Sequence, residues 1–183
     1  MLKEALQKVI TTLDELRVPY ALIGGLAVIA RGVMRATKDV DLLVDWSLLE
    51  AGSLAQALNE NRLPATFRKG APDDPLVGLI RIAIPSGAAP TKVDILFPSA
   101  SWQREAVRKA APLDLEGFAV RVVQAADLFL LKLHAGGPMD FFDAARLLEL
   151  QTADERRAWK ARAASLGKSK AFAECLKFLR KNG

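Results

Sequence analysis

The chain has 183 residues, enough for one domain or for one domain with a small appendage. Its composition, 51% hydrophobic and 26% charged, is that of an ordinary globular protein, and its apolar stretches are too short to span a bilayer. The amphipathic, acid-containing N-terminus is unlike a signal or transit peptide, and the single cysteine, Cys175, excludes an internal disulfide. We therefore expect a cytoplasmic protein with no membrane partner.

The net charge of +5 is unevenly distributed along the chain. From Gln151 onward nine lysines and arginines accompany three acids, a net charge of +6, whereas residues 1–150 carry about −1. One interpretation is a surface that binds RNA, for example tRNA, or another polyanion. The other is the solvated face of two amphipathic helices. The sequence leaves both open.

The first half of the chain alternates helical patterns with short apolar strands. Helices are expected at residues 3–17, 26–31 and 47–59, the last with Ser47 as its N-cap. Strands are expected at Tyr20–Ile23, Val40–Val44, Ala65–Arg68, Val77–Ile84 and Lys92–Phe97. Turn residues at 70–75 and 85–90 separate the last three strands, and the second turn is long enough for an antiparallel hairpin.

The second half is predicted to be mostly helical. A helix at 101–109 and a weaker strand or hairpin at 113–122 precede helices at 125–134, 138–150, 154–164 and 168–180. A mixed sheet followed by a run of helices is an α+β arrangement. We expect a core of about five to six strands at residues 1–122. A C-terminal helical region at 123–183 follows, either as a second unit or as part of the same domain.

Two aspartates share one face of a strand that otherwise looks buried. Because side chains alternate along a strand, Asp39 and Asp41 project together while Val40 points away. At an effective dielectric constant near 20, two charges this close repel by roughly 3 kcal/mol. Salt bridges to Arg35 or Lys38, a shared proton or a divalent cation could each offset the repulsion.

A third carboxylate lies in another short apolar strand. Asp94, within TKVDILF, is flanked by Val93 and Ile95. If this strand lies beside Val40–Val44, three carboxylates converge at one place on the sheet. Hard oxygen ligands from two strands suit Mg²⁺ or Mn²⁺, and such a centre supports phosphoryl or nucleotidyl transfer.

The Gly24-Gly25 pair is compatible with the same chemistry. It lies between a predicted strand and a predicted helix, where backbone N–H groups and the helix dipole favour phosphate. The absence of a Cβ lets a ligand approach the backbone closely. Alone, such a pair is more often only a tight turn. Followed by Asp39-x-Asp41 on a strand, it is a more specific signal.

Together these motifs resemble a known family. LIGGLAVIARGVMRATKDVDLLVD, followed by VDIL, is similar to the nucleotidyltransferases of the DNA polymerase beta superfamily, with a glycine turn, a strand bearing two acids and a third acid on a later strand. The later stretch DLFLLKLHAGGPMDFFDAARLL is similar to a segment of the minimal bacterial abortive-infection, or type IV toxin–antitoxin, nucleotidyltransferases. The resemblance covers residues 20–45, 91–97 and 127–148.

The resemblance implies roles for the residues already singled out. A nucleoside triphosphate would bind over metal at Asp39 and Asp41, and Gly24 and Gly25 would contact its phosphates. Asp94 would be the third acid, acting as a base or activator for an acceptor hydroxyl.

The helical motif adds a lysine and two further acids. Lys132 matches the family's lysine and lies within an apolar run, where its ammonium must snorkel or find a carboxylate or phosphate. Asp140 and Asp143 share a helix face and either pair with Lys132 or position nucleotide. Thr37 either caps a turn or contacts nucleotide.

Two cations usual in the family are replaced here. Gly137 and Met139 stand where an arginine and a lysine are expected. Arg31, Arg35 and Arg81 are the candidate substitutes, with Arg35 counted in the nucleotide site.

The sequence thus favours an Mg²⁺- or Mn²⁺-dependent nucleotidyltransferase that moves NMP from NTP to a hydroxyl of RNA or protein. The resemblance implies a toxin with a cognate antitoxin protein. The alternatives are a catalytically idle nucleotide- or RNA-binding module of the same fold, and a plain RNA-binding protein that uses the basic tail.

Overall fold

The computed structural model describes residues 2–70, 77–85, 89–115 and 117–180. Within them the chain forms one seven-stranded sheet and eight α-helices. The strands are β1 (Tyr20–Ile23), β2 (Asp39–Val44), β3 (Ala65–Lys69), β4 (Gly78–Ile84), β5 (Thr91–Leu96), β6 (Ala111–Asp114) and β7 (Ala119–Val122). The helices are α1 (Leu2–Glu15), α2 (Gly24–Ala30), α3 (Ala51–Glu60), α4 (Ser101–Arg108), α5 (Ala125–Ala135), α6 (Pro138–Glu149), α7 (Ala153–Ser165) and α8 (Ser169–Arg180).

The sheet is mixed, with strand order β3-β4-β5-β2-β1-β7-β6. β2 runs parallel to β5 and β1 runs parallel to β7, whereas the remaining neighbours are antiparallel. The α+β class and the expected hairpin between β4 and β5 are confirmed. The sheet has one or two more strands than expected, because the weak pattern at 113–122 forms both β6 and β7.

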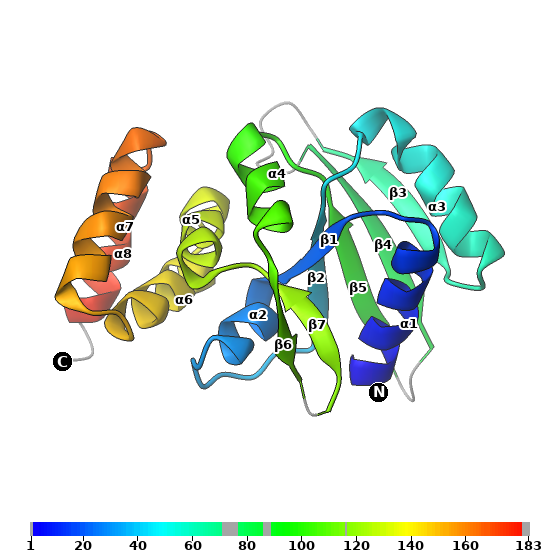
Figure 1. The fold of residues 1–183 in the computed structure, drawn as a ribbon, viewed down its shortest axis with the longest axis horizontal. Coiled ribbons are helices and arrows are strands. Elements are labelled where there is room, and N and C mark those ends of the chain that lie inside the picture. Colours follow the sequence, from blue (N-terminus) through cyan, green and yellow to red (C-terminus); the bar gives the residue numbers. More distant parts are fainter. Residues whose placement is uncertain (1, 71–76, 86–88, 116, 181–183) are drawn as a thin grey trace.

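The helices lie on both sides of this sheet (Figure 1). α1 packs against β2 and β5, and α3 packs against β3. On the other side, α5 to α8 form a bundle that contacts the rest of the chain through α2 and α4. The buried apolar residues of the sheet and of the C-terminal helices form one continuous cluster. Burying each large side chain contributes roughly 1.5–3 kcal/mol. Because one cluster includes residues of both parts, this burial holds the helical region against the sheet.

One expected helix start is wrong. Ser47 does not cap a long helix: its hydroxyl accepts a hydrogen bond from the Leu49 N–H at 3.2 Å and caps a single 3₁₀ turn, Leu48–Glu50. α3 begins only after this turn, at Ala51. The expected loop at 70–75 and the middle of the turn at 85–90 lie largely outside the described residues. Among the residues that are described, no helix is long and apolar enough to cross a membrane.

Candidate active site

The three predicted carboxylates meet on two neighbouring strands. β2 and β5 are parallel and in register, with Asp41 directly opposite Asp94 and Asp39 two residues earlier on β2. The alternation of side chains places Asp39 and Asp41 on the same face of the sheet. The convergence expected from sequence is therefore present, because the hairpin β4–β5 returns the chain to the edge of β2.

Asp41 lies in a crowded and negatively charged environment. Burial, together with the charges of Asp94 and Asp39, raises the pKa of Asp41 to about 6, although the nearby Lys132 ammonium opposes this shift. Neither the Asp39 nor the Asp41 carboxylate makes a hydrogen bond or ion pair with another described residue. Asp41 is thus a partly buried carboxylate with an excess of negative charge around it.

Asp94 is neutralised by an arginine that the sequence did not single out for it. Arg81 on β4 lies directly opposite Asp94 in the antiparallel pair. Its Nε lies 2.9 Å from Asp94 Oδ1 and its Nη2 lies 2.6 Å from Asp94 Oδ2, a two-point contact. This contact raises the pKa of the Arg81 guanidinium.

The Gly24 turn fits against the Asp41 carboxylate. Gly24 follows β1 and begins α2 with a φ of +66°, and a Cβ at this position would lie 1.9 Å from Asp41 Oδ2. At Gly25, a Cβ would lie 2.9 Å from Thr37 Oγ1 and 3.1 Å from Arg35 Nη2. Both positions require glycine because side chains of the following segment pack directly on the backbone.

The helical motif forms an ion-pair cluster beside this turn. Lys132 Nζ lies 2.9 Å from both Asp140 Oδ1 and Asp143 Oδ2, so the prediction that these acids pair with Lys132 is confirmed. Burial lowers the pKa of Lys132, but its hydrogen bonds and the charges of the two aspartates outweigh burial, and the net pKa lies above its ordinary value. Asp140 Oδ2 also accepts the Gly137 N–H at 3.2 Å, at the start of α6.

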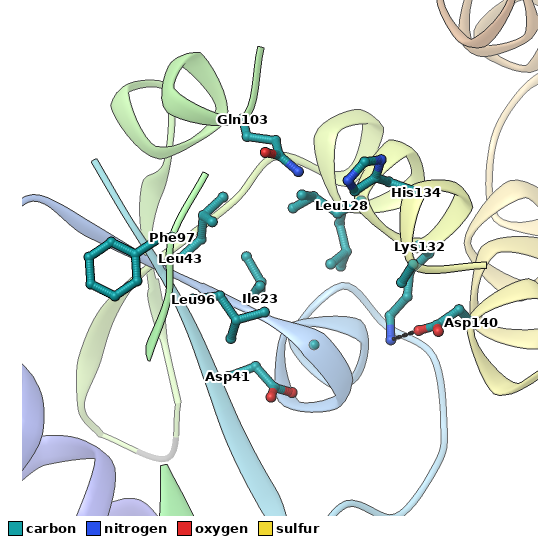
Figure 2. Close-up of a pocket in the computed structure, with 13 residues that line it drawn as sticks. Ile23, Asp41, Leu43, Leu96, Phe97, Gln103, Leu128, Lys132, His134 and Asp140 are labelled. Carbon is teal, nitrogen blue, oxygen red and sulfur yellow. Dashed lines mark hydrogen bonds and ion pairs between the residues drawn. The ribbon is translucent and has the colours of Figure 1, made fainter. Parts of the chain in front are cut away.

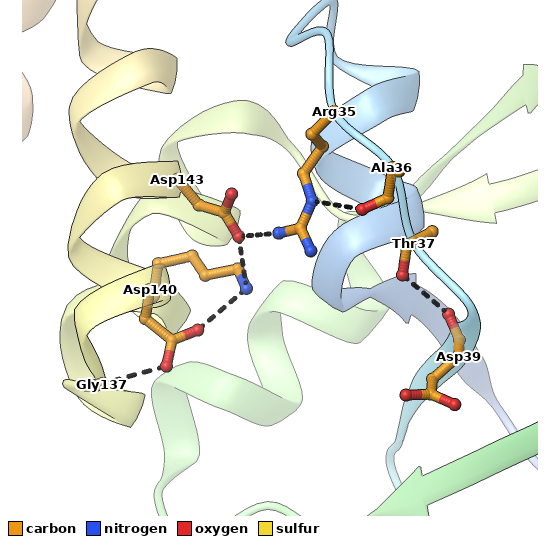
Figure 3. Close-up of polar contacts among 8 residues, drawn as sticks. Arg35, Ala36, Thr37, Asp39, Gly137, Asp140 and Asp143 are labelled. Atoms are coloured by element: carbon orange, nitrogen blue, oxygen red, sulfur yellow. Dashed lines mark hydrogen bonds and ion pairs between the residues drawn. The ribbon is translucent and has the colours of Figure 1, made fainter.

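Arg35 joins the same cluster and does not neutralise the strand carboxylates. Its Nη1 lies 2.5 Å from Asp143 Oδ2, and its Nε donates to the Ala36 carbonyl (Figure 3). Of the three ways left open to offset the charge of Asp39 and Asp41, a salt bridge to Arg35 is therefore not the one that the structure uses. Lys38 likewise forms no ion pair with another described residue. Thr37 donates to the Asp39 carbonyl at 3.3 Å, which is the local role left open for it.

The other candidate cations are also engaged. Arg31 donates to the Val122 and Val123 carbonyls at the end of β7, with distances down to 2.6 Å. Arg81 is held by Asp94. As the structure stands, all three candidate substitutes for the cations missing at Gly137 and Met139 have partners inside the protein.

A cavity of about 250 Å³ opens beside Asp41 (Figure 2). Its walls are mostly apolar, with Leu43, Leu96 and Leu128 among them, and Lys132 lies at one side. Gln103 of α4 and His134 of α5 lie at the end away from Asp41. Neither was predicted as a site residue. No local motif marks them, since α4 and α5 bring them together only in the folded chain.

Most cations of the basic tail have partners within the chain. The described ones pair as follows: Arg156 with the carbonyls of Glu149 and Gln151, Arg157 with Asp154, Arg162 with Asp127, Lys168 with His134, and Lys177 with Glu174. Lys160 and Lys170 have no such partner among the described residues. The helices thus use much of their positive charge internally, and RNA binding by this surface stays a prediction.

The carboxylates of β2 and β5 are the candidate ligands for a metal ion. Among the residues that the structure describes, no three histidine, cysteine, aspartate or glutamate side chains are arranged to hold an ion. Because Arg81 occupies both oxygens of Asp94, the open carboxylates are Asp39 and Asp41. Burial and the neighbouring acids raise the pKa of Asp41, and the hard oxygens of this pair fit a divalent cation that would relieve the excess negative charge.

Comparisons with solved structures place the fold among known nucleotidyltransferase-like proteins. The chain is similar to an antigenic nucleotidyltransferase-like protein from Paracoccidioides brasiliensis, with 17% identity and a TM-score of 0.55 over 96% of this chain and 92% of that one. It is also similar to the lincosamide antibiotic adenylyltransferase LnuA, with 15% identity and a TM-score of 0.50 over 81% of this chain and 97% of that one. At these identities the likeness shows the fold alone.

The curated proteins offer no match. A family model does match, over residues 9–181, and its description is nucleotidyl transferase AbiEii toxin of type IV TA (toxin–antitoxin) systems. Because this match covers nearly the whole chain, the protein belongs to the AbiEii family of nucleotidyltransferases.

Proposed function

We propose that the protein transfers NMP from an NTP to a hydroxyl acceptor on RNA or protein, with Mg²⁺ or Mn²⁺, as the toxin of a toxin–antitoxin pair. The observation that carries this proposal is the register of β2 and β5, which brings Asp39, Asp41 and Asp94 together beside the Gly24 turn. Membership of the AbiEii family supports the class of reaction and the toxin role.

In this proposal Asp39 and Asp41 would hold the divalent cation. A bound cation would neutralise negative charge on the triphosphate and on the leaving pyrophosphate. The Gly24 and Gly25 backbone would contact phosphate through N–H groups at the start of α2, beside the Asp41 carboxylate.

Asp94 would act on the acceptor. The acceptor oxygen would attack the α-phosphorus, its proton would pass to Asp94, and pyrophosphate would leave. Arg81 orients Asp94 through both of its oxygens, and one of the two Arg81 contacts must open before Asp94 can accept a proton.

Lys132 is the cation that best matches those that the family carries around the turn at Gly137 and Met139. It lines the cavity beside Asp41, while Asp140 and Asp143 keep it charged and fix its position. We expect it to meet a phosphate group of the nucleotide, by sharing its three N–H donors between the aspartates and the ligand.

The test is transfer of label from each of the four α-labelled NTPs to total RNA and total protein, with Mg²⁺ or Mn²⁺. The wild type should label an acceptor and Asp41→Asn should not. Asp154→Asn is the matched control, because Asp154 is an exposed residue in a surface ion pair on α7. The proposal would be contradicted if none of the four NTPs labelled RNA or protein and if the protein showed no metal-dependent NTP binding.

One observation favours a second candidate, a nucleotide-binding module without turnover. The third acid is already neutralised by Arg81, and Gly137 and Met139 replace two cations usual in the family. Metal-dependent NTP binding without transfer to any acceptor would select this candidate. A neighbouring gene whose product relieves growth arrest on overexpression would instead favour the active toxin.

A further inference from the structure

Gln103 is held in one orientation at the end of the cavity away from Asp41. Its Oε1 accepts hydrogen bonds from the Ser99 N–H at 2.6 Å, the Ala100 N–H at 3.1 Å and the Ser99 hydroxyl at 3.0 Å. Backbone N–H groups can only donate, so the two of them require an acceptor at this position. The amide therefore cannot be turned around, and its NH₂ group must point the other way.

The NH₂ group of Gln103 faces the cavity. The residue is only 5% exposed and lines the cavity wall. Its Nε2 donates to no other described residue. Among the described side chains, the one fully enclosed polar atom without a partner is Asp143 Oδ1. Gln103 Nε2 therefore keeps accessible surface, and Figure 2 shows the nitrogen on the side toward Leu128 and the cavity interior.

At the end away from Asp41, the cavity combines apolar walls with this oriented donor. Leucine side chains from β2, β5 and α5 form much of its surface, and its volume of about 250 Å³ is below the roughly 300 Å³ at which pockets for drug-sized ligands begin. A space of this size accommodates one planar ring system. A ring with apolar faces and hydrogen-bond acceptors on its edge is the chemistry of a nucleobase.

We propose that this cavity binds a nucleobase and that Gln103 Nε2 donates to an acceptor on the edge of that base, which makes Gln103 a specificity-determining residue. This inference rests on the proposed function, because Asp41 lies at the opposite end of the same cavity. The base comes either from the NTP or from the terminal nucleotide of an RNA acceptor. A buried donor aimed at one edge favours bases with an acceptor there and disfavours those with an amino group.

The chain permits a clean substitution. Gln103→Glu keeps an oxygen for the Ser99 and Ala100 N–H groups, so the start of α4 stays capped, but it replaces the NH₂ donor by an acceptor. Any uniform repulsion between the new charge and phosphates weakens all four nucleotides by the same factor. The ratios of their affinities therefore report the edge contact alone. Gln7→Glu is the matched control, because Gln7 is exposed on α1 and the charge change is identical.

The experiment measures Kd for ATP, CTP, GTP and UTP by calorimetry with Mg²⁺, and Kd for RNA oligonucleotides that differ only in the terminal base. The Gln103→Glu change should shift the ratio between the base that the wild type prefers and the amino-bearing bases by about tenfold or more, and Gln7→Glu should leave all ratios unchanged. A shift confined to the NTP series assigns the cavity to the NTP base, and one confined to the RNA series assigns it to the acceptor.

If Gln103→Glu changes Kd by the same factor for every base in a series, or leaves Kd unchanged, the ratios stay constant. Constant ratios in both series overturn the inference while the proposed function stands. The wild-type measurement is read first: if the wild type binds none of the four NTPs, the proposed function fails and the inference falls with it. Thermal unfolding of Gln103→Glu confirms that the variant is folded.

Discussion

Arg81 and Asp94 lie directly opposite each other on β4 and β5, joined by contacts of 2.9 Å and 2.6 Å. On its other side Asp94 faces Asp41 on β2. One carboxylate therefore lies between a cation and a second acid. The Arg81 charge limits the repulsion that Asp94 exerts on Asp41, and its removal should make the site more dependent on a divalent cation.

Arg81→Met should accordingly increase the stabilisation that Mg²⁺ confers. Without the guanidinium, the three acids repel one another more strongly, and a ligand that binds only the folded state raises Tm according to its affinity. The measurement is Tm by thermal unfolding in EDTA and in excess Mg²⁺. An Mg²⁺-induced rise in Tm that is equal in Arg81→Met and wild type would argue against a cation at Asp39 and Asp41.

Asp41 should make stability fall as pH rises. Its pKa is about 6 in the folded protein against 3.8 in the unfolded chain, so the folded state holds the proton more tightly. The cost of ionising Asp41 is absent below about pH 4, grows through the window between the two values, and is complete above about pH 6, where it reaches roughly 3 kcal/mol. Asp41→Asn lacks this cost.

Urea unfolding in EDTA between pH 4 and 7 measures the effect. The free energy of unfolding of Asp41→Asn should exceed that of the wild type by an amount that grows with pH. A difference between the two proteins that stays constant across this range would show that Asp41 has an ordinary pKa.

Gly24→Ala should disrupt the site through a clash. The backbone at Gly24 has a φ of +66°, and the added Cβ would lie 1.9 Å from Asp41 Oδ2. Gly167→Ala is the control, because Gly167 has a φ of +69° with no neighbouring atom within 4 Å of the added Cβ. The backbone strain, about 1 kcal/mol, is common to both.

The loss of unfolding free energy should therefore be larger for Gly24→Ala than for Gly167→Ala by at least about 1 kcal/mol. Nucleotidyl transfer should be lost only in Gly24→Ala, since Asp41 is displaced. Equal losses of stability and intact transfer in both variants would show that Asp41 moves aside without consequence.

Asp143→Asn should destabilise the protein strongly. The Asp143 side chain is fully buried and neutralises both Arg35 and Lys132. Loss of one partner leaves buried cations uncompensated, which costs about 3 kcal/mol or more, although Asp140 still holds Lys132. Urea unfolding should show this loss, whereas Asp154→Asn on the exposed surface should cause no measurable change. A mild effect at Asp143 would mean that water compensates the cations.

Local sequence patterns were enough to predict several parts of the candidate site. The Gly24-Gly25 turn, the two acids of β2 and the lone acid of β5 are visible because each breaks an otherwise apolar strand or ends it. Helix boundaries were predicted closely for α4 to α8, since amphipathic spacing depends only on nearby residues. The α+β class follows from the order of these elements.

The pairing of charges, in contrast, depends on how distant elements pack in the folded chain. Arg35 pairs with Asp143, 108 residues away, and not with the adjacent strand acids, because the segment after α2 passes beside α6. Arg81 reaches Asp94 because the β4–β5 register places them opposite each other. Gln103 becomes a cavity residue only when α4 packs beside α5. Electrostatic partners and cavities depend on distances in space between elements far apart along the chain, which sequence periodicity does not contain.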